Sequence, residues 1–266
     1  AGRLDDGYSR ISWLCVMLYR LTLNPLWLDA CAVGVNNDRF GLNSYGANRQ
    51  FFSFTDDEVY VDGGSFTGYT IEHFMRAVGG RFRHIHAFEP SADNIAQIRA
   101  RLEGLQAGAY AGLPVVERVS LVQQGLWSRE GRLKFVPGLT VDKASGAAIH
   151  PLTAHLVDTG MIGHLYDREA QDRMAIEVPV TTIDRATGES ATFIKLEIEG
   201  AELEALHGAT KTLERNRPRM ALSVYHKPED LAAITRFVLD AGLGYRLGFR
   251  QHNPFCPDAM VLYCQP

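Results

Sequence analysis

VYVDGGSFTG, residues 59–68, is the stretch that decides the fold of this chain. A short run of strand-forming residues, 59–61, is stopped by Asp62 and two glycines. A helical pattern follows, in which one face collects the apolar residues Ile71, Phe74, Met75 and Val78. A strand, a glycine-rich turn and a helix in this order predict the first unit of an open α/β sheet, with the turn as its ligand-binding loop.

The alternation of strands and helices continues along the chain. Further strands are expected at 84–88, 119–122, 133–136, 176–180, 192–196, 220–224, 245–249 and 260–264. Helices are expected after Ser91, over 203–213 and after Pro228. Repeated β-α-β order implies right-handed crossovers, and therefore a doubly wound, mostly parallel α/β sheet. The last two strands are expected to form an antiparallel hairpin at the sheet edge.

Two segments depart from this alternation. Residues 1–50 predict an amphipathic helix and a second short helix, which we interpret as a helical appendage to a main domain at 51–266. A homodimer interface and a membrane-surface helix are the alternatives, and the absence of a Lys/Arg cluster disfavours the membrane. Residues 137–177 contain a long connection with little periodicity, which predicts a lid or insertion.

Composition narrows the class of protein. Hydrophobic residues make up 46% of the chain, charged residues 22%, and the net charge is -4, as in an ordinary globular protein that does not bind nucleic acid. No apolar run is long enough to span a membrane. Four cysteines, 15, 31, 256 and 264, fit no metal-binding spacing, and no metal site is predicted. We interpret them as reduced thiols of a cytoplasmic protein, with pairing of the last two as a weaker alternative.

The glycine-rich turn has a distinct chemistry. The dinucleotide fingerprint G-x-G-x-x-G fails, because its third position is occupied by Ser65 when the motif is started at Gly63. What fits is D-x-G-x-x-x-G, formed by Asp62, Gly64 and Gly68. An acidic strand end suits a cationic ligand, and S-adenosylmethionine carries an ammonium and a sulfonium group. These five residues therefore predict a cofactor loop for S-adenosylmethionine, with a turn that binds nothing as the alternative.

A second acidic residue follows the next expected strand. Glu89 lies about 20 residues beyond the glycine loop, where doubly wound folds place the acid that binds ribose hydroxyls. The alternative is a helix-start charge, favoured by the helix dipole. Gln124 and Gly125 follow the third strand and are candidates for the adenine pocket by topology alone.

FIKLEIEGAE, residues 193–202, places ionisable groups at the end of a parallel strand, where open α/β sheets bind ligands. Lys195, Glu197 and Glu199 are therefore candidate catalytic residues, and Glu197 is also a candidate cofactor contact. His226 follows the next strand and is the preferred candidate base, with Glu199 as its alternative. Glu202 is interpreted as a residue that opens the following helix.

The motifs VDGGSFTG, HAFEP, TTID, FIKLEIEGAELEALHGA and VYHKPEDL, in this order, resemble the FkbM-type methyltransferases. The resemblance covers roughly residues 58–263, and its most specific part is IKLEIEGAE followed by L-x-G-A. It implies a Rossmann-like class I fold with a seven-stranded sheet, and S-adenosylmethionine as the methyl donor. It also implies O-methylation of a sugar, polysaccharide or secondary metabolite, so the expected partner is a small-molecule or glycan acceptor.

Two positions depart from the family pattern. Many members have an aspartate where this chain has Tyr69, and many have an aspartate where it has Glu197. Two other functions stay open, and the loss of one acid from the cofactor loop bears on the second of them. One is a nicotinamide-dependent oxidoreductase on a similar sheet, which the failed fingerprint disfavours. The other is a catalytically inactive module for cofactor binding or assembly.

Overall fold

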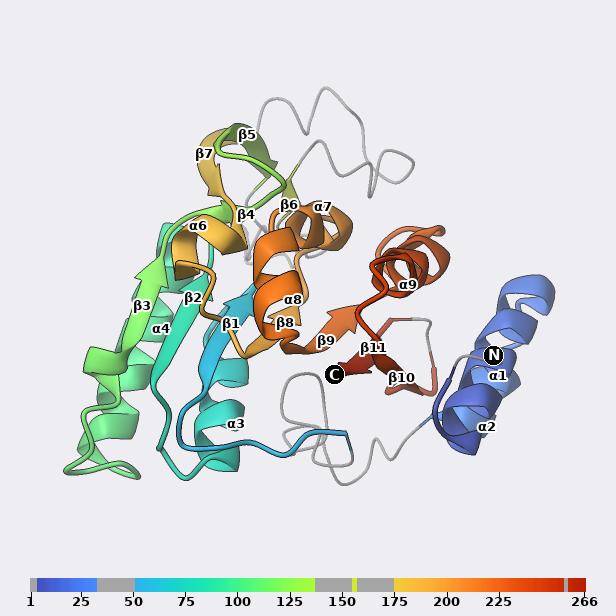
Figure 1. Ribbon diagram of the computed structural model, residues 1–266, viewed down its shortest axis with the longest axis horizontal. Helices are drawn as coiled ribbons and strands as arrows, with labels where there is room; N and C mark the ends of the chain where they lie inside the picture. The colour runs from blue at the N-terminus through green and yellow to red at the C-terminus, as the bar shows by residue number, and fades with distance from the viewer. Residues whose placement is uncertain (1–3, 33–50, 137–154, 157–174, 256–257) are drawn as a thin grey trace, which may run out of the picture.

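The computed structural model describes residues 4–32, 51–136, 155–156, 175–255 and 258–266. Its main sheet has seven strands in the order β10-β11-β9-β8-β1-β2-β3 (Figure 1). Six strands run in the same direction, and β11 runs antiparallel to the two strands beside it, β10 and β9. The strands are β1 (Val59–Gly63), β2 (His84–Phe88), β3 (Val119–Val122), β8 (Phe193–Leu196), β9 (Arg219–Ser223), β10 (Arg246–Gln251) and β11 (Met260–Gln265).

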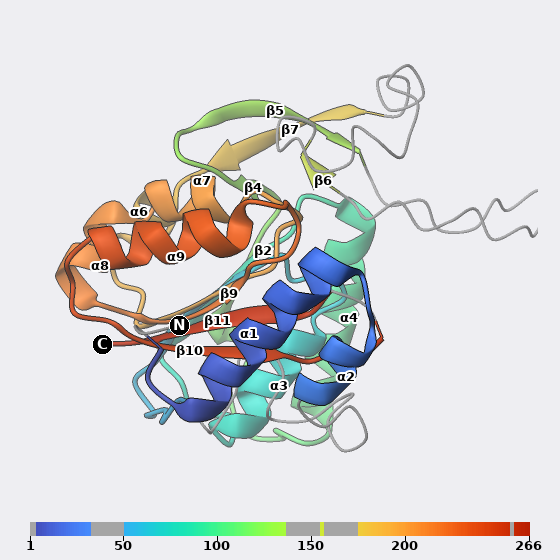
Figure 2. The same cartoon turned by 90° about the vertical axis from the view of Figure 1, so that its right-hand side faces the viewer.

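Helices cover both faces of this sheet (Figure 2). One face carries α3 (Tyr69–Ala77) and α4 (Ala92–Ala107), and the other carries α6 (Ile183–Thr187), α7 (Glu202–His207), α8 (Thr210–Asn216) and α9 (Asp230–Asp240). A short 3-10 turn, η2 (Val116–Arg118), precedes β3. The doubly wound, mostly parallel sheet expected from the sequence is confirmed. The chain order reverses between β1 and β8, which places a ligand crevice at the carboxyl ends of these two strands.

The single helix expected over 203–213 is wrong. The structure has two helices, α7 and α8, separated around Gly208. A Cβ atom at Gly208 would lie 2.2 Å from the carbonyl oxygen of Trp127, so the backbone must pass very close to the neighbouring chain. Helical periodicity alone cannot reveal this contact, because the facing residue lies far away in the sequence.

A second, smaller sheet has the order β4-β7-β5-β6. Its strands are β4 (Gly125–Leu126), β5 (Gly131–Val136), β6 (His155–Leu156) and β7 (Ile176–Thr181). It lies beyond the carboxyl ends of β1, β2 and β3 (Figure 1). The strands expected at 133–136 and 176–180 are thus present, but they pair with each other outside the main sheet. Most of the lid predicted at 137–177 lies outside the described residues.

The N-terminal helices α1 (Gly7–Thr22) and α2 (Leu26–Cys31) lie beside β10 at the edge of the sheet (Figures 1 and 2). The Ser9 hydroxyl accepts hydrogen bonds from the Phe249 amide at 2.9 Å and from the Arg250 guanidinium at 2.7 Å. On its outer side α1 exposes the apolar side chains of Ile11, Leu14 and Leu21. The homodimer through these helices stays a prediction.

Within the described ranges, no helix is long and apolar enough to cross a membrane. Cys15, Cys31 and Cys264 are buried free thiols. Cys256 lies outside the described residues.

Candidate active site

The glycine loop turns directly after β1. Gly64 and Gly68 adopt left-handed backbone angles, with φ of 73° and 82°. A Cβ atom at Gly64 would lie 1.9 Å from the carbonyl oxygen of Glu197, so only glycine fits there. The amides of Gly64 and Ser65 both donate to the carbonyl of Phe88, at 3.1 Å each. The loop is therefore held between the ends of β2 and β8.

Asp62 is fully buried on β1. One carboxylate oxygen accepts a 2.6 Å hydrogen bond from the Thr70 hydroxyl at the start of α3. The other lies 3.2 Å from the ammonium of Lys195. One oxygen is thus hydrogen-bonded and the other is held by the charge of Lys195, so Asp62 contributes to the site by supporting the loop.

Lys195 is equally buried, and its ammonium faces the glycine loop from within. It donates to the carbonyl oxygens of Gly63 and Gly64 at 3.0 Å and 2.9 Å. The sequence suggested that Lys195 borders the reaction crevice. With no exposed surface, this cation instead fixes the loop backbone that any ligand would meet.

Glu89, just after β2, is also almost completely buried. Its two oxygens accept from the amides of Phe66 and Ser91, at 2.9 Å each. Burial raises the pKa of this carboxyl, while hydrogen bonds from Ser91, Asn94 and Phe66 oppose the rise. Glu89 therefore ties the glycine loop to the start of α4. A carboxylate has about four lone-pair sites, so each oxygen retains capacity for a further donor.

The adenine-pocket candidates lie where the chain leaves the main sheet. The Gln124 amide donates to the Val122 carbonyl at 2.8 Å, which closes a tight turn after β3. Gly125 begins β4 and pairs with Val180 on β7. They stand at the junction of the two sheets, on the side of the crevice.

Glu197, immediately after β8, is partly accessible, with 18% of its side chain exposed. It accepts a 2.9 Å hydrogen bond from the Tyr225 hydroxyl, and its other oxygen lies 3.7 Å from the Lys195 ammonium. Tyr69, which stands where relatives carry an acid, has a pKa raised first by burial and then by Glu197, Asp62 and Glu199. Its phenol therefore faces the same group of carboxylates.

Glu199 and His226 form the next layer of the crevice. The Glu199 side chain is 24% exposed, whereas that of His226 is only 4% exposed. A Glu199 oxygen lies 3.5 Å from Nε2 of His226, and Nδ1 of His226 lies 2.9 Å from Glu202. Burial raises the pKa of Glu199 to about 7. Burial lowers the pKa of His226, but Glu202 and then Glu199 outweigh it and raise the pKa to about 9.

The sequence makes His226 the preferred base, a role that needs a neutral imidazole ring, and this assignment stays a prediction. The ion pair with Glu202 favours the protonated ring instead, and a protonated imidazole cannot accept a proton. Glu199, the alternative base, is both more exposed and unprotonated over part of the neutral range.

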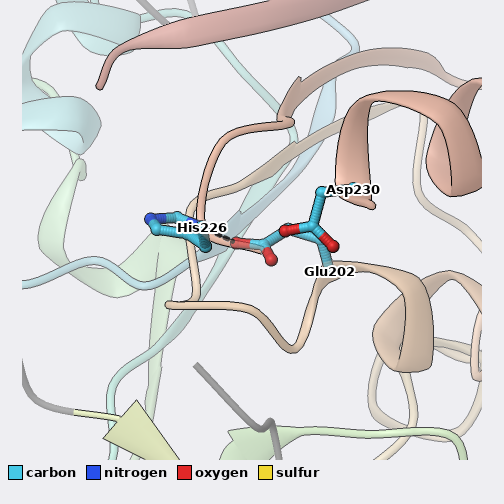
Figure 3. Close-up of side chains that lie close together, drawn as sticks. All are labelled: Glu202, His226 and Asp230. Carbon is cyan, nitrogen blue, oxygen red and sulfur yellow. Dashed lines mark ion pairs between the residues drawn. The ribbon is translucent and has the colours of Figure 1, made fainter. Parts of the chain in front are cut away.

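The same cluster also contains three possible metal ligands. Glu202, His226 and Asp230 each present a possible ligand atom, all within 4.8 Å of one another. Opposed ligands of an ion with bonds of about 2.1 Å are separated by only about 4.2 Å. Figure 3 shows the Glu202 carboxylate between the other two side chains, so the groups form a row rather than a cage around a common point.

Sequence reasoning missed three contributors to the site. Thr70 and Tyr225 supply hydroxyls to Asp62 and Glu197. Tyr225 belongs to the VYHKPEDL motif, but the sequence alone assigned no role to either residue. Glu202 was interpreted only as a helix-opening residue, yet its carboxylate pairs with His226. The one available signal was its spacing, three residues after Glu199 and therefore close to it at the start of a helix.

A groove of about 520 Å³ lies elsewhere, in the outer layer formed by α7, α8 and α9. Leu203, His207 and Phe237 are among its lining residues. It is built from helix surfaces rather than strand ends, so we do not assign the active site to it.

Comparison with known proteins agrees with this geometry. Residues 44–247 match the family model described as the methyltransferase FkbM domain. The crystal structure of methyltransferase FkbM from Methylobacillus flagellatus is 22% identical, with a TM-score of 0.74 over 99% of this chain and 56% of that chain. The present chain thus spans little more than half the length of that relative. No curated protein sequence matches this chain.

Other solved structures match this chain at TM-scores below 0.5. Precorrin-6y C5,15-methyltransferase from Geobacter metallireducens is 12% identical, with a TM-score of 0.43 over 81% of this chain and 84% of that chain. Aeropyrum pernix fibrillarin with natively bound S-adenosylmethionine is 10% identical, with a TM-score of 0.42 over 97% of this chain and 76% of that chain. Because the family model matches most of its residues, this chain belongs to the FkbM methyltransferase family.

Proposed function

We propose that this protein transfers a methyl group from S-adenosylmethionine to a hydroxyl group of a sugar, polysaccharide or secondary metabolite. The observation that carries the proposal is the pair of accessible carboxylates, Glu197 and Glu199, directly beside a glycine loop at the end of β8. The loop offers a binding surface, and the carboxylates offer negative charge and a proton acceptor. Both are needed to methylate an alcohol.

The residues present fit the cofactor. Because Gly64 has no Cβ atom, the glycine loop can pass directly against the Glu197 backbone at the end of β8. The remaining lone pairs of Glu89 suit a ribose diol, and the exposed edge of Glu197 suits a cationic group. Gln124 and Gly125 are the proposed adenine neighbours. When bound, S-adenosylmethionine would supply an electrophilic methyl group, whose bond breaks with the electron pair left on sulfur.

The proton lost by the acceptor hydroxyl is assigned to Glu199. This carboxylate reaches the crevice, whereas His226 lies behind it in contact with Glu202. Lys195 and Asp62 act indirectly in this proposal, because their ion pair holds the loop in place. Positioning of the hydroxyl against the methyl group accounts for most of the expected rate enhancement.

Three further expectations belong to this proposal. The acceptor is a small molecule or glycan, not a nucleic acid. The protein acts in the cytoplasm, where its buried free thiols remain reduced. The catalytically inactive module remains the rival, because Tyr69 replaces an acid of the family pattern.

The test has two parts. Titration calorimetry with S-adenosylhomocysteine measures cofactor binding, with NADH as the comparison ligand. Transfer of tritium from methyl-labelled S-adenosylmethionine is then measured over a panel of monosaccharides, oligosaccharides and hydroxylated polyketides. Transfer should fall by about 10²–10⁴ in Glu199→Gln, with binding little changed. Binding without transfer to any acceptor favours the inactive module, and binding of NADH alone overturns the proposal.

A further inference from the structure

Three side chains form a continuous row from the crevice into the protein. Glu199 lies 3.5 Å from Nε2 of His226. Nδ1 of the same ring lies 2.9 Å from a carboxylate oxygen of Glu202, and Figure 3 shows this second pair. The exposed fraction of the side chain falls from 24% to 4% and then to 0% along this row. Each ring nitrogen therefore faces a carboxylate, one accessible and one buried.

The local backbone builds this row. Glu199 and Gly200 both adopt left-handed angles, with φ of 55° and 89°, and so make a sharp turn between β8 and α7. A left-handed conformation is costly for a residue with a side chain, and such strain gathers at functional sites. The turn directs the Ile198 amide to a Glu202 oxygen, at 2.8 Å. That hydrogen bond holds the buried Glu202 carboxylate in place beside the His226 ring.

At the buried end of the row, hydrogen bonds do not compensate the whole negative charge of the Glu202 carboxylate. The second oxygen of Glu202 is fully buried and has no hydrogen-bond partner among the described residues. Asp230 stands beside it and accepts a 2.7 Å hydrogen bond from the Lys227 amide (Figure 3). A buried carboxylate in this setting needs a cation close by, and the His226 ring is placed to be that cation.

We propose that Glu202 is a positioning residue that holds the His226 ring as an imidazolium against Glu199, and so keeps Glu199 in the crevice as an ionised proton acceptor. The inference rests on the proposed function, because it assigns to Glu199 the proton of the acceptor hydroxyl. His226 keeps both of its protons throughout, and each ring nitrogen lies within ion-pair distance of one carboxylate oxygen, at 2.9 Å from Glu202 and 3.5 Å from Glu199. The arrangement resembles the buried acid of a catalytic triad, which orients a histidine without taking its proton.

The charges around the row agree with this assignment. Glu202 is the largest influence that raises the pKa of His226, and His226 is the largest that lowers the pKa of Glu199. Burial raises the pKa of Asp230 to about 6, and the charge of Glu202 adds to this rise. The two carboxyl groups of Glu202 and Asp230 therefore give the buried end of the row an excess of negative charge. The titratable groups that face the row from the neighbouring elements are Tyr69, Lys195, Glu197, Lys227 and Asp230.

The decisive experiment is a titration of His226 by ¹⁵N NMR in the full chain, with its ring signals assigned from the His226→Gln spectrum. In the parent protein both ring nitrogens should remain protonated until a midpoint near pH 9. In Glu202→Gln the midpoint should fall well below that of the parent, because the largest influence that raises the pKa of His226 is removed. Glu204→Gln, two residues further along α7, is the matched control and should leave the midpoint unchanged.

A second readout follows Glu199 itself by ¹³C NMR of the glutamate carboxyls. Its midpoint, near pH 7 in the parent, should rise in His226→Gln, because the carboxylate loses its nearest cation. Glu202→Asp keeps the charge and should restore a His226 midpoint above 7.

Several outcomes would overturn the inference. One is a His226 ring that is neutral at pH 7 in the parent protein, and another is an unchanged midpoint in Glu202→Gln. A third is a His226 signal that moves on addition of zinc chloride and returns with EDTA, which would make the cluster a metal site. Titration calorimetry with S-adenosylhomocysteine is run on the same samples. A parent protein that does not bind would count against the proposed function, and a variant that still binds is a folded one.

Discussion

Asp62 and Lys195 occupy directly opposed positions on β1 and β8, and their charged groups lie 3.2 Å apart with no exposed surface. The next positions along the same row of the sheet are Ala87 on β2 and Ala221 on β9. These small neighbours leave room for the long lysine side chain within the sheet. The ion pair joins the two strands whose ends form the crevice, and its ammonium also holds the glycine loop.

Replacement of this lysine should therefore affect both stability and binding. Lys195→Met leaves Asp62 charged and buried without its cation, and we expect a loss of about 3–5 kcal/mol in the free energy of unfolding. Affinity for S-adenosylhomocysteine should also fall, because the loop carbonyls lose their donor. Urea unfolding and titration calorimetry measure the two effects. Lys211→Met, at an exposed site, should change neither.

The double variant Lys195→Met with Asp62→Asn tests whether the two side chains stabilise the protein as an ion pair or independently of each other. Removal of the second charge should recover part of the stability lost in Lys195→Met, since the uncompensated buried carboxylate is gone. Losses that simply add would show that the two side chains act independently.

Glu89 should be essential for both the loop and the cofactor. In Glu89→Gln, one oxygen is replaced by an amide group that cannot accept from the Phe66 or Ser91 amide. The variant also loses the charge of the proposed hydrogen bonds to the ribose hydroxyls, each worth roughly 1.5–3 kcal/mol, so the dissociation constant for S-adenosylhomocysteine should rise at least about tenfold. Calorimetry measures this rise, and Glu103→Gln on the exposed side of α4 serves as the control. Unchanged affinity would limit Glu89 to a role in starting the helix.

The docking of α1 on β10 should depend on Ser9. Its hydroxyl is the acceptor for the buried Phe249 amide, and Ser9→Ala leaves that amide unpaired at a cost of about 1–3 kcal/mol. Hydrogen exchange over residues 7–22 should become faster. Ser12→Ala is a close control, because the Ser12 hydroxyl is also buried on α1 but makes no hydrogen bond among the described residues. Equal effects of the two variants would contradict this account.

Stability should fall as the solution becomes mildly acidic, and His252 should contribute. Burial and the nearby Arg250 lower the pKa of His252 to about 4, below the ordinary value of 6.5. The unfolded chain therefore binds a proton at a higher pH than the folded protein does. The contribution to stability is complete above about pH 6.5 and is lost as the pH falls toward 4.

The change can be measured by urea unfolding at pH 7, 6 and 5. His252→Gln should flatten the decline in the free energy of unfolding over this range, by roughly 1–3 kcal/mol in total. His207→Gln, at an exposed site, should leave the decline as steep as in the parent. A decline of the same steepness in His252→Gln would assign the acid sensitivity to other groups.

The order of most strands and helices, and the place of the ligand crevice, follow from local patterns in the sequence. Apolar periodicity sets which residues face the core, and a glycine turn after a strand sets where the chain can approach a ligand. For that reason the doubly wound sheet, the glycine loop and the acid after β2 were predictable. The family resemblance rested on the same motifs.

Only the tertiary structure decided how the polar groups pair. Lys195 pairs with Asp62, which is 133 positions earlier in the chain. His226 pairs with Glu202, and the strand β9 lies between these two residues in the sequence. The second sheet and the break at Gly208 likewise depend on contacts between distant segments. Local pattern cannot specify such partners, because they are chosen by strand register and side-chain packing. Those contacts also set the charge of each group, since proton affinity depends on burial and on neighbouring charges.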